Sequence, residues 1–288
     1  MTFSFRIRKK RVNRSFWGSF SLFVLLAAFG AFMILPLVYA INNAFKPLDE
    51  IFMFPPTLFV RNPTMNNFID LMGLLGNSWV PFSRYIFNTV FITGMGIIGH
   101  VLLASAAAYP LAKHKFPGKK LMFGVVVLAL MFTPAVTAIP TYMIMSWLGL
   151  IDTYWAVIIP AFAYPLGLYL MKQFMEQIPD VLLEAAKIDG ASEYRIFWTI
   201  VMPNVKPAWL TLIILLFQIL WGSDGNGFIY SEQLKSLHFA ANQIVQGGIA
   251  RAGAAAAVAL LLMSVPITLF VFSQSRIIET MATSGMKD

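Results

Sequence analysis

The sequence contains no cysteine, which excludes disulfide frameworks and thiol chemistry. It is also poor in charge, because only 12% of its 288 residues are charged, whereas a soluble domain carries about a quarter. Hydrophobic residues make up 58% of the chain, and the mean hydropathy is +0.72. We therefore expect lipid to be the solvent for much of this protein.

Acidic side chains are missing from the interior of the long apolar runs, where His100 is the one ionisable residue. Proton- and sodium-coupled carriers place Asp, Glu or His along their path, so this pattern weighs against a secondary transporter. We expect His100 to form a hydrogen bond between packed helices. An intramembrane hydrolase needs converging polar groups, and two of the three histidines lie in loops.

A phosphate-binding loop is absent as well. Gly118-Lys119-Lys120 lacks both the upstream glycine and the following Ser or Thr of that motif. The chain is therefore not expected to hydrolyse ATP or to be an enzyme, and no catalytic residue, metal site or cofactor is predicted.

Positive charge is in excess, with a formal net charge of +8 and a pI near 9.7. The lysines and arginines flank the apolar runs. This placement indicates membrane topology and contact with the anionic headgroups of a lipid bilayer, rather than binding to nucleic acid.

Six apolar runs have about the 20 residues that a spanning helix needs. Because backbone groups in hydrocarbon must be satisfied within the segment, we expect all six to be helices. Prolines inside several of them, such as the five named below, indicate either packing kinks or breaks beside a wet cavity. The runs are 16–41, 84–110, 121–145, 154–173, 207–223 and 252–274, and the prolines are Pro134, Pro140, Pro160, Pro165 and Pro266.

The positive charges also predict the orientation. Sixteen of the 21 lysines and arginines lie on the side of both termini, which is therefore cytoplasmic. The predicted fold is an all-α membrane protein with six transmembrane helices and a cytoplasmic helix between the fourth and fifth. Its parts are a basic cytoplasmic N-terminal segment (1–15), a six-helix domain (16–274) and a cytoplasmic tail (275–288). Within the domain, segments 42–83 and 224–251 face outward, and 174–206 is a cytoplasmic loop.

The cytoplasmic loop 174–206 has a helical pattern. Pro179 suits the first residue of a helix, and an apolar stripe follows, with Glu184 at its edge. Gly190 ends this helix, since glycine takes positive φ without steric cost. The acids on the rim outnumber the bases, which favours a protein partner over a lipid surface. The stripe consists of Val181, Leu182, Ala185 and Ile188.

A second short helix is predicted after the glycine. Ser192 can cap it, and Tyr194, Phe197 and Trp198 fall on one face at helical spacing. The loop is therefore expected to form two short helices joined by a sharp elbow. A channel would not explain such a patterned inner loop.

The same loop resembles the signature loop of ABC importer permeases. That signature has Glu-Ala-Ala, then a glycine, then an isoleucine and a proline at fixed spacing, and here it is Glu184-Ala185-Ala186, Gly190, Ile200 and Pro203. Met202 replaces the usual leucine. Segment 45–51 and the tail also resemble the smaller, maltose-type carbohydrate permease of such importers. The glycine-rich run 222–227 departs from that pattern.

The resemblance implies a set of partners and roles. A second permease subunit would complete a heterodimer, two ATPase subunits would hydrolyse ATP, and an extracytoplasmic binding protein would deliver a carbohydrate. The chain would be a multi-pass protein of the bacterial cytoplasmic membrane, working by alternating access. Its contacts with the ATPases would come from Glu184, Ala185, Ala186, Asp189, Gly190 and Ala191. Ala185 and Ala186 would pack closely, Glu184 and Asp189 would make charged or capping contacts, and Gly190 would set the elbow.

The solute path is predicted from aromatic and amide side chains within the spans, since aromatic faces and polar groups bind sugars. The same side chains also occur in interfacial belts and between packed helices. The candidates are Asn88, Tyr164, Gln218 and Trp221. A permease for a non-sugar solute is the alternative within transport, and an integral-membrane enzyme or channel is the alternative outside it.

Overall fold

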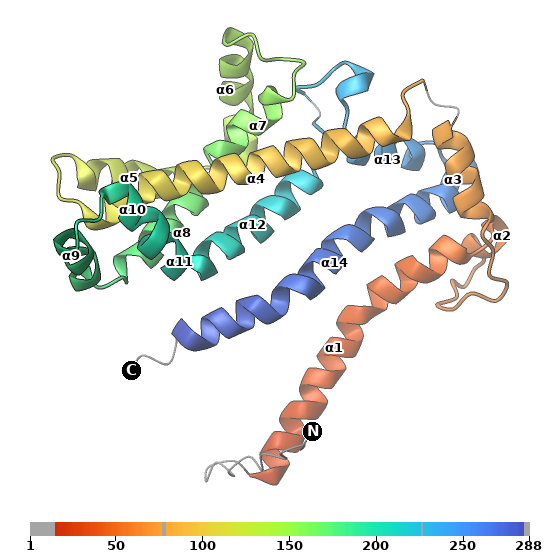
Figure 1. The fold of residues 1–288 in the computed structure, drawn as a ribbon. Coiled ribbons are helices and arrows are strands. Elements are labelled where there is room, and N and C mark those ends of the chain that lie inside the picture. The colour runs from red at the N-terminus through yellow and green to blue at the C-terminus, as the bar shows by residue number, and fades with distance from the viewer. Residues whose placement is uncertain (1–14, 77–78, 226, 285–288) are drawn as a thin grey trace, which may run out of the picture.

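The computed structural model describes residues 15–76, 79–225 and 227–284, so most of the basic segment 1–15 and the last residues of the tail lie outside it. Regular structure in these ranges is entirely helical (Figure 1). The long helices and their connecting short ones are α1 (Phe16–Phe45), α2 (Leu48–Ile51), α3 (Asn66–Gly76), α4 (Phe82–Lys113), α5 (Lys119–Ala129), α6 (Pro134–Trp147), α7 (Trp155–Phe162), α8 (Pro165–Glu176), α9 (Asp180–Ile188), α10 (Glu193–Ile196), α11 (Met202–Asn204), α12 (Lys206–Trp221), α13 (Leu237–Val245) and α14 (Ala252–Ser284). A π-helical turn, η1 (Phe197–Val201), and two 3-10 turns, η2 (Glu232–Leu234) and η3 (Ile249–Arg251), complete the set.

Within the described ranges, four helical segments are long and apolar enough to cross a membrane. They are Trp17–Phe45, Phe82–Lys113, Trp155–Glu176 and Ile249–Phe272. Two bent helix pairs raise the number to six if each pair is one span. The all-helical class is therefore confirmed, and each of the six predicted runs overlaps one of these segments or bent pairs.

The third predicted span, 121–145, is not one straight helix. It consists of α5 and α6, whose axes differ by 112°. Pro134 begins α6, and the preceding Thr133 is extended, with φ −78° and ψ 152°. A residue before proline is pushed out of the α region by the proline ring, so α5 ends before this point.

Two other spans also differ from the sequence prediction. The fifth, predicted as 207–223, is α12 and ends at Trp221, and a 74° bend separates it from Glu193–Asn204 in the predicted loop. The sixth, predicted to end at 274, continues as α14 to Ser284, so the tail begins inside a helix. Pro266 lies within α14 without ending it.

Helix α4 is the centre of one half of the structure. It packs against α7, α8, α12 and α13. Glycines on α4 allow two of these close approaches, because a Cβ on Gly96 would lie 2.5 Å from Leu220 and one on Gly99 would lie 2.1 Å from Phe162. Helix α14 contacts α12 on one side and α1 on the other, and α1 extends away from the α4 half (Figure 1).

Candidate functional site

The α9–α10 hairpin (residues 180–196) is the segment that the sequence singled out. Its first helix starts at Asp180, with Pro179 as the preceding cap residue rather than the first helical one. Leu183 faces inward and is 6% exposed. The predicted apolar stripe faces outward, since Val181 and Ile188 are 73% and 86% exposed. The hairpin therefore presents apolar side chains that nothing in the described chain covers.

The elbow between the two helices is built as predicted. Gly190 has a φ of +80°, and its N–H donates to the Lys187 carbonyl over 3.0 Å. The N–H of Ala191 donates to the Ala186 carbonyl over 2.9 Å. These two bonds form a Schellman motif, which satisfies the last carbonyls of α9. Ser192 then caps α10 by accepting a bond of 3.3 Å from the Arg195 N–H.

Polar contacts attach the hairpin to the end of α4. The Tyr109 hydroxyl donates to the Glu193 carboxylate over 2.8 Å, and Lys187 pairs with the same carboxylate over 2.5 Å. His114 Nε2 lies 3.8 Å from it. Glu193 therefore connects α4, α9 and α10 through one side chain.

A second attachment uses Lys113, at the last position of α4. Its ammonium pairs with Asp180 over 2.8 Å and donates to the carbonyls of Glu176 and Ile178. The hydrogen bond that Lys113 donates to Asp180 holds the pKa of the Asp180 carboxyl below its ordinary value. The positive charges of Lys113, Lys115 and Lys119 lower it further. The start of α9 is thus fixed to α4 as well.

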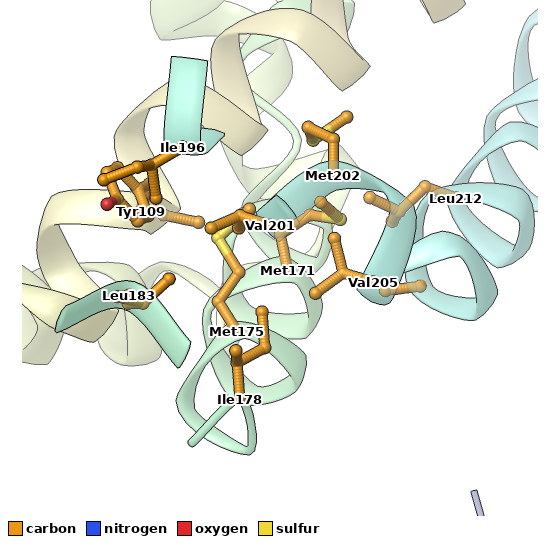
Figure 2. Packing of buried hydrophobic residues seen from close by; sticks show 12 residues of the cluster. Tyr109, Met171, Met175, Ile178, Leu183, Ile196, Val201, Met202, Val205 and Leu212 are labelled. Carbon is orange, nitrogen blue, oxygen red and sulfur yellow. The ribbon is translucent and has the colours of Figure 1, made fainter. Parts of the chain in front are cut away.

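A buried hydrophobic core lies beneath the hairpin (Figure 2). Leu183 and Ile196 contribute from the hairpin, and Met171 and Met175 contribute from α8. Each such apolar side chain contributes about 1.5–3 kcal/mol when fully buried. The other members are Ala108, Tyr109, Ile178, Val201, Met202, Val205, Ala208 and Leu212. The hairpin is therefore packed onto α4, α8 and α12 and has little freedom to move independently of them.

Comparison with known proteins finds a family match that includes this region. Residues 100–281 match the model of the binding-protein-dependent transport system inner membrane component family. This match covers more than half of the chain and includes the whole hairpin.

The chain belongs to this family.

Several curated relatives are named as permease proteins of transport systems. Protein LplC of Bacillus subtilis is 33% identical over 207 residues, which is 72% of this chain and 68% of the relative. The arabinooligosaccharides transport system permease protein AraQ of Halalkalibacterium halodurans is 33% identical over 65% of this chain and 67% of its own. The sn-glycerol-3-phosphate transport system permease protein UgpE of Yersinia enterocolitica is 31% identical over 67% and 69%.

A solved structure shares the fold. A chain of a bacterial ABC transporter involved in the import of the acidic polysaccharide alginate superposes with a TM-score of 0.76 at 19% identity. The match covers 93% of this chain and 99% of the solved one. Family membership confirms that the protein is a transport subunit of the bacterial inner membrane rather than an enzyme.

The predicted coupling residues of the permease do not all face the same way. Glu184, Ala185 and Asp189 are exposed. Ala186 and Ala191, in contrast, pack against the buried core. From the sequence, we expected the same close-packing role for Ala185 and Ala186. Consecutive residues on a helix, however, point in directions about 100° apart. Ala186 therefore belongs to the attachment and Ala185 to the outer surface.

Two predicted solute-path residues of the permease are occupied by structural contacts. Asn88 is 0% exposed, donates to the carbonyls of Gln233 and Lys235 over 2.9 and 2.8 Å, and accepts from the Tyr154 hydroxyl. Trp221 is buried, and its indole N–H donates to the Leu262 carbonyl over 3.3 Å. Neither side chain has a free polar atom within the described residues, and the assignment of both to the path stays a prediction.

The other two candidates remain accessible. Gln218 is exposed on α12. Tyr164 lies at the break between α7 and α8, where it lines a largely apolar cavity of about 310 Å³. His100 borders the same cavity, and its Nδ1 lies 2.9 Å from the Phe162 carbonyl, which the break has freed. The prediction that His100 forms a hydrogen bond between helices is confirmed.

Sequence reasoning missed the residues that attach the hairpin. Tyr109 and Lys113 were part of a predicted span and of a basic cluster, and Glu193 was one acid among several on the rim. Their spacing of four residues on α4 puts Tyr109 and Lys113 on one helix face, but their partners are 84 and 67 residues away, respectively. Among the residues whose side chains the structure describes, no cluster of His, Asp or Glu could hold a metal ion.

Proposed function

We propose that this permease is the smaller of two membrane subunits in an ATP-driven importer, and that its α9–α10 hairpin docks on a partner ATPase. The observation that carries this proposal is the combination of an exposed apolar stripe on α9 with a rigid attachment behind it. Val181, Leu182 and Ile188 have no partner within the described chain that would bury them. A helix of this kind suits a hydrophobic groove on another protein.

The charges around the stripe fit a protein groove. Glu184 and Asp189 are exposed beside it and form no ion pair within the described residues. They are available to basic groups of an ATPase subunit. The excess of Lys and Arg on the same side of the membrane predicts that this side is cytoplasmic, where ATP is available.

The mechanism we propose is alternating access driven from the hairpin. Closure of two ATPase subunits on ATP would move α9. Because α9 is fixed to α4, α8 and α12 through the buried core, these helices would move with it as a body. An extracytoplasmic binding protein would deliver the solute to the opposite side, and a second permease subunit would complete the pore.

For the solute we propose a sugar or oligosaccharide. The name of the relative AraQ supports this class. The environment of Lys172 in α8 also favours an uncharged solute, because its positive charge already has partners within the chain. This lysine is buried, pairs with Glu176 over 2.6 Å and lies 4.0 Å from the centre of the Phe123 ring. Its charge is therefore already compensated. Gln218 and Tyr164 are the residues that we propose for solute contact.

A polar, anionic solute is the second candidate, because the relative UgpE is named for sn-glycerol-3-phosphate. Uptake of labelled oligosaccharides and of glycerol phosphate by cells that express the importer would separate the two. Uptake of the phosphate ester alone would overturn the sugar assignment and leave the importer assignment intact.

The docking proposal is tested by charge reversal on the hairpin. Glu184→Arg, made in the complete importer, should weaken co-purification of the ATPase subunits and reduce ATP-dependent uptake, while the permease still inserts. Asp70→Arg is the matched control, since Asp70 is exposed on α3, away from the hairpin. Gly190→Pro should have the same effect as Glu184→Arg, because proline is locked near φ −65° and this position needs +80°. Normal uptake in both hairpin variants would contradict the proposal.

A further inference from the structure

Helix α4 is the one long, unbroken helix that reaches the hairpin. It has 32 residues, which corresponds to a length of about 48 Å at 1.5 Å per residue. The spans beside it are interrupted: α5 and α6 meet at 112°, α12 follows a 74° bend, and α7 and α8 are separated by residues 163–164. Figure 1 shows α4 running from the hairpin at one end to the α3 and α13 region at the other.

At the Lys113 end, α4 is joined to the hairpin by a buried aromatic residue. Tyr109 is 7% exposed, and its ring lies 5.6 Å from that of Phe197. Its hydroxyl donates to Glu193 over 2.8 Å. A hydrogen bond to a charged group is stronger than one between neutral groups and has a preferred direction, so this contact fixes the position of α10 relative to α4.

At the Phe82 end, α4 is joined to the segment 232–237, which lies between α12 and α13. Asn88 donates to two main-chain carbonyls of this segment, as described above. Thr89 Oγ1 accepts from the Leu237 N–H over 2.8 Å, and the Tyr85 hydroxyl donates to Glu232 over 2.8 Å. Three side chains near one end of α4, those of Tyr85, Asn88 and Thr89, therefore hold the same short loop.

The main-chain groups in this second attachment are costly to release. Asn88 and Thr89 are 0% and 2% exposed, so water cannot replace their bonds without opening the packing. A buried donor or acceptor that loses its partner bears the full cost of desolvation. The loop 232–237 is thus constrained to follow α4 whenever α4 moves.

We propose that α4 is the element that transmits movement between the hairpin and the loop 232–237, with Tyr109 and Thr89 as positioning residues at its two ends. This inference rests on the proposed function. The loop lies on the predicted outer side of the membrane. Binding of a solute-loaded binding protein at this loop would therefore change the position of the hairpin on the ATPases through α4. In the opposite direction, ATP-driven closure of the ATPases would move the loop.

The test uses two substitutions that keep shape and remove one polar contact each. Tyr109→Phe removes the bond to Glu193, and Thr89→Val removes the acceptor for the Leu237 N–H. Tyr39→Phe and Thr141→Val are the matched controls. Within the described residues the Tyr39 hydroxyl makes no side-chain hydrogen bond, and the Thr141 hydroxyl donates only to the Thr137 carbonyl of its own helix.

The measurement is ATP hydrolysis by the complete importer in proteoliposomes, with and without solute-loaded binding protein. Each test variant should lower the ratio of stimulated to basal hydrolysis by about tenfold, the effect of losing one strong hydrogen bond. The double variant should be no worse than the poorer single variant, because both contacts belong to one link. The controls should keep the wild-type ratio.

Two results would overturn the inference. One is a stimulation ratio within about twofold of the wild-type ratio in both test variants. Loss of one such hydrogen bond is expected to change the ratio by more than this. The other is a loss in the double variant equal to the product of the two single losses. If Tyr109→Phe fails to assemble, Glu193→Gln tests the same contact. Failure of the proposed function would be distinct, since wild type itself would then show no stimulation.

Discussion

Lys113 at the end of α4 forms an ion pair of 2.8 Å with Asp180 at the start of α9. The two side chains are unequal partners, since that of Lys113 is 7% exposed and that of Asp180 is 75% exposed. The same ammonium also donates to the carbonyls of Glu176 and Ile178, where α8 ends. A cation at a helix C-terminus satisfies carbonyls that have no partner within the helix. Lys113 therefore fixes the junction between α8 and α9.

The first prediction concerns this junction. Lys113→Met should lower the stability of the permease by about 1–3 kcal/mol, because two main-chain carbonyls and a carboxylate lose a buried donor. Asp180→Asn should have a smaller effect, since the lysine keeps its carbonyl contacts. Thermal unfolding of the two purified variants measures the difference. An equal loss in both would show that the ion pair, and not the carbonyl contacts, is the stabilising part.

The second prediction is a pH dependence that belongs to Asp180. Its hydrogen bond with Lys113 lowers the pKa of the carboxyl below the ordinary value of 3.8. The stability from this pair is therefore present above the ordinary pKa and is lost as the pH falls through the lowered one. The stability difference between wild type and Asp180→Asn should stay constant from neutral pH down to about pH 4 and shrink below it. A difference that already shrinks between pH 7 and pH 5 would contradict this.

The third prediction concerns the contact of α4 with α8. A Cβ on Gly167 would lie 1.8 Å from His100 Nε2, so the ring must move and lose its bond to the Phe162 carbonyl. Gly167→Ala should destabilise the permease by about 1–3 kcal/mol, the usual cost of overpacking. Gly94→Ala is the control, because a Cβ there meets nothing within 4 Å. Unfolding temperatures of the two variants in the same detergent give the comparison.

The fourth prediction separates solute contact from packing on α12. Gln218→Ala should raise the solute concentration needed for half-maximal uptake and leave stability unchanged, because Gln218 is exposed. Trp221→Phe should lower stability and leave that concentration unchanged, since the indole is buried and bonded to Leu262. Uptake and unfolding are measured on both variants. A shift in solute dependence for Trp221→Phe alone would reverse the two assignments.

Local features of the hairpin could be predicted from the sequence because they depend on neighbours a few residues apart. The positive φ at Gly190, the Ser192 cap and the amphipathic α9 all follow from residue type and spacing. The same holds for the role of His100, which is the one ionisable residue in the interior of the long apolar runs.

Other features could not be predicted, because they depend on which residues meet across the fold. The sequence does not indicate that the amide of Asn88 bonds to the loop 232–237, which is far from it along the chain. Ala185 and Ala186 looked equivalent until the core was seen to lie on one side of α9. The angle of 112° between α5 and α6 could not be predicted either. Pro134 indicates a break in the helix, but it does not determine the direction in which the chain continues.

The sequence by itself determined that this is a helical membrane protein with a patterned polar loop, because hydropathy, charge placement and glycine positions act locally along the chain. Only the tertiary structure decided how that loop is joined to the rest. Tyr109, Lys113 and Glu193 acquire their roles from contacts between residues more than 60 positions apart, and such contacts exist only once the helices have packed.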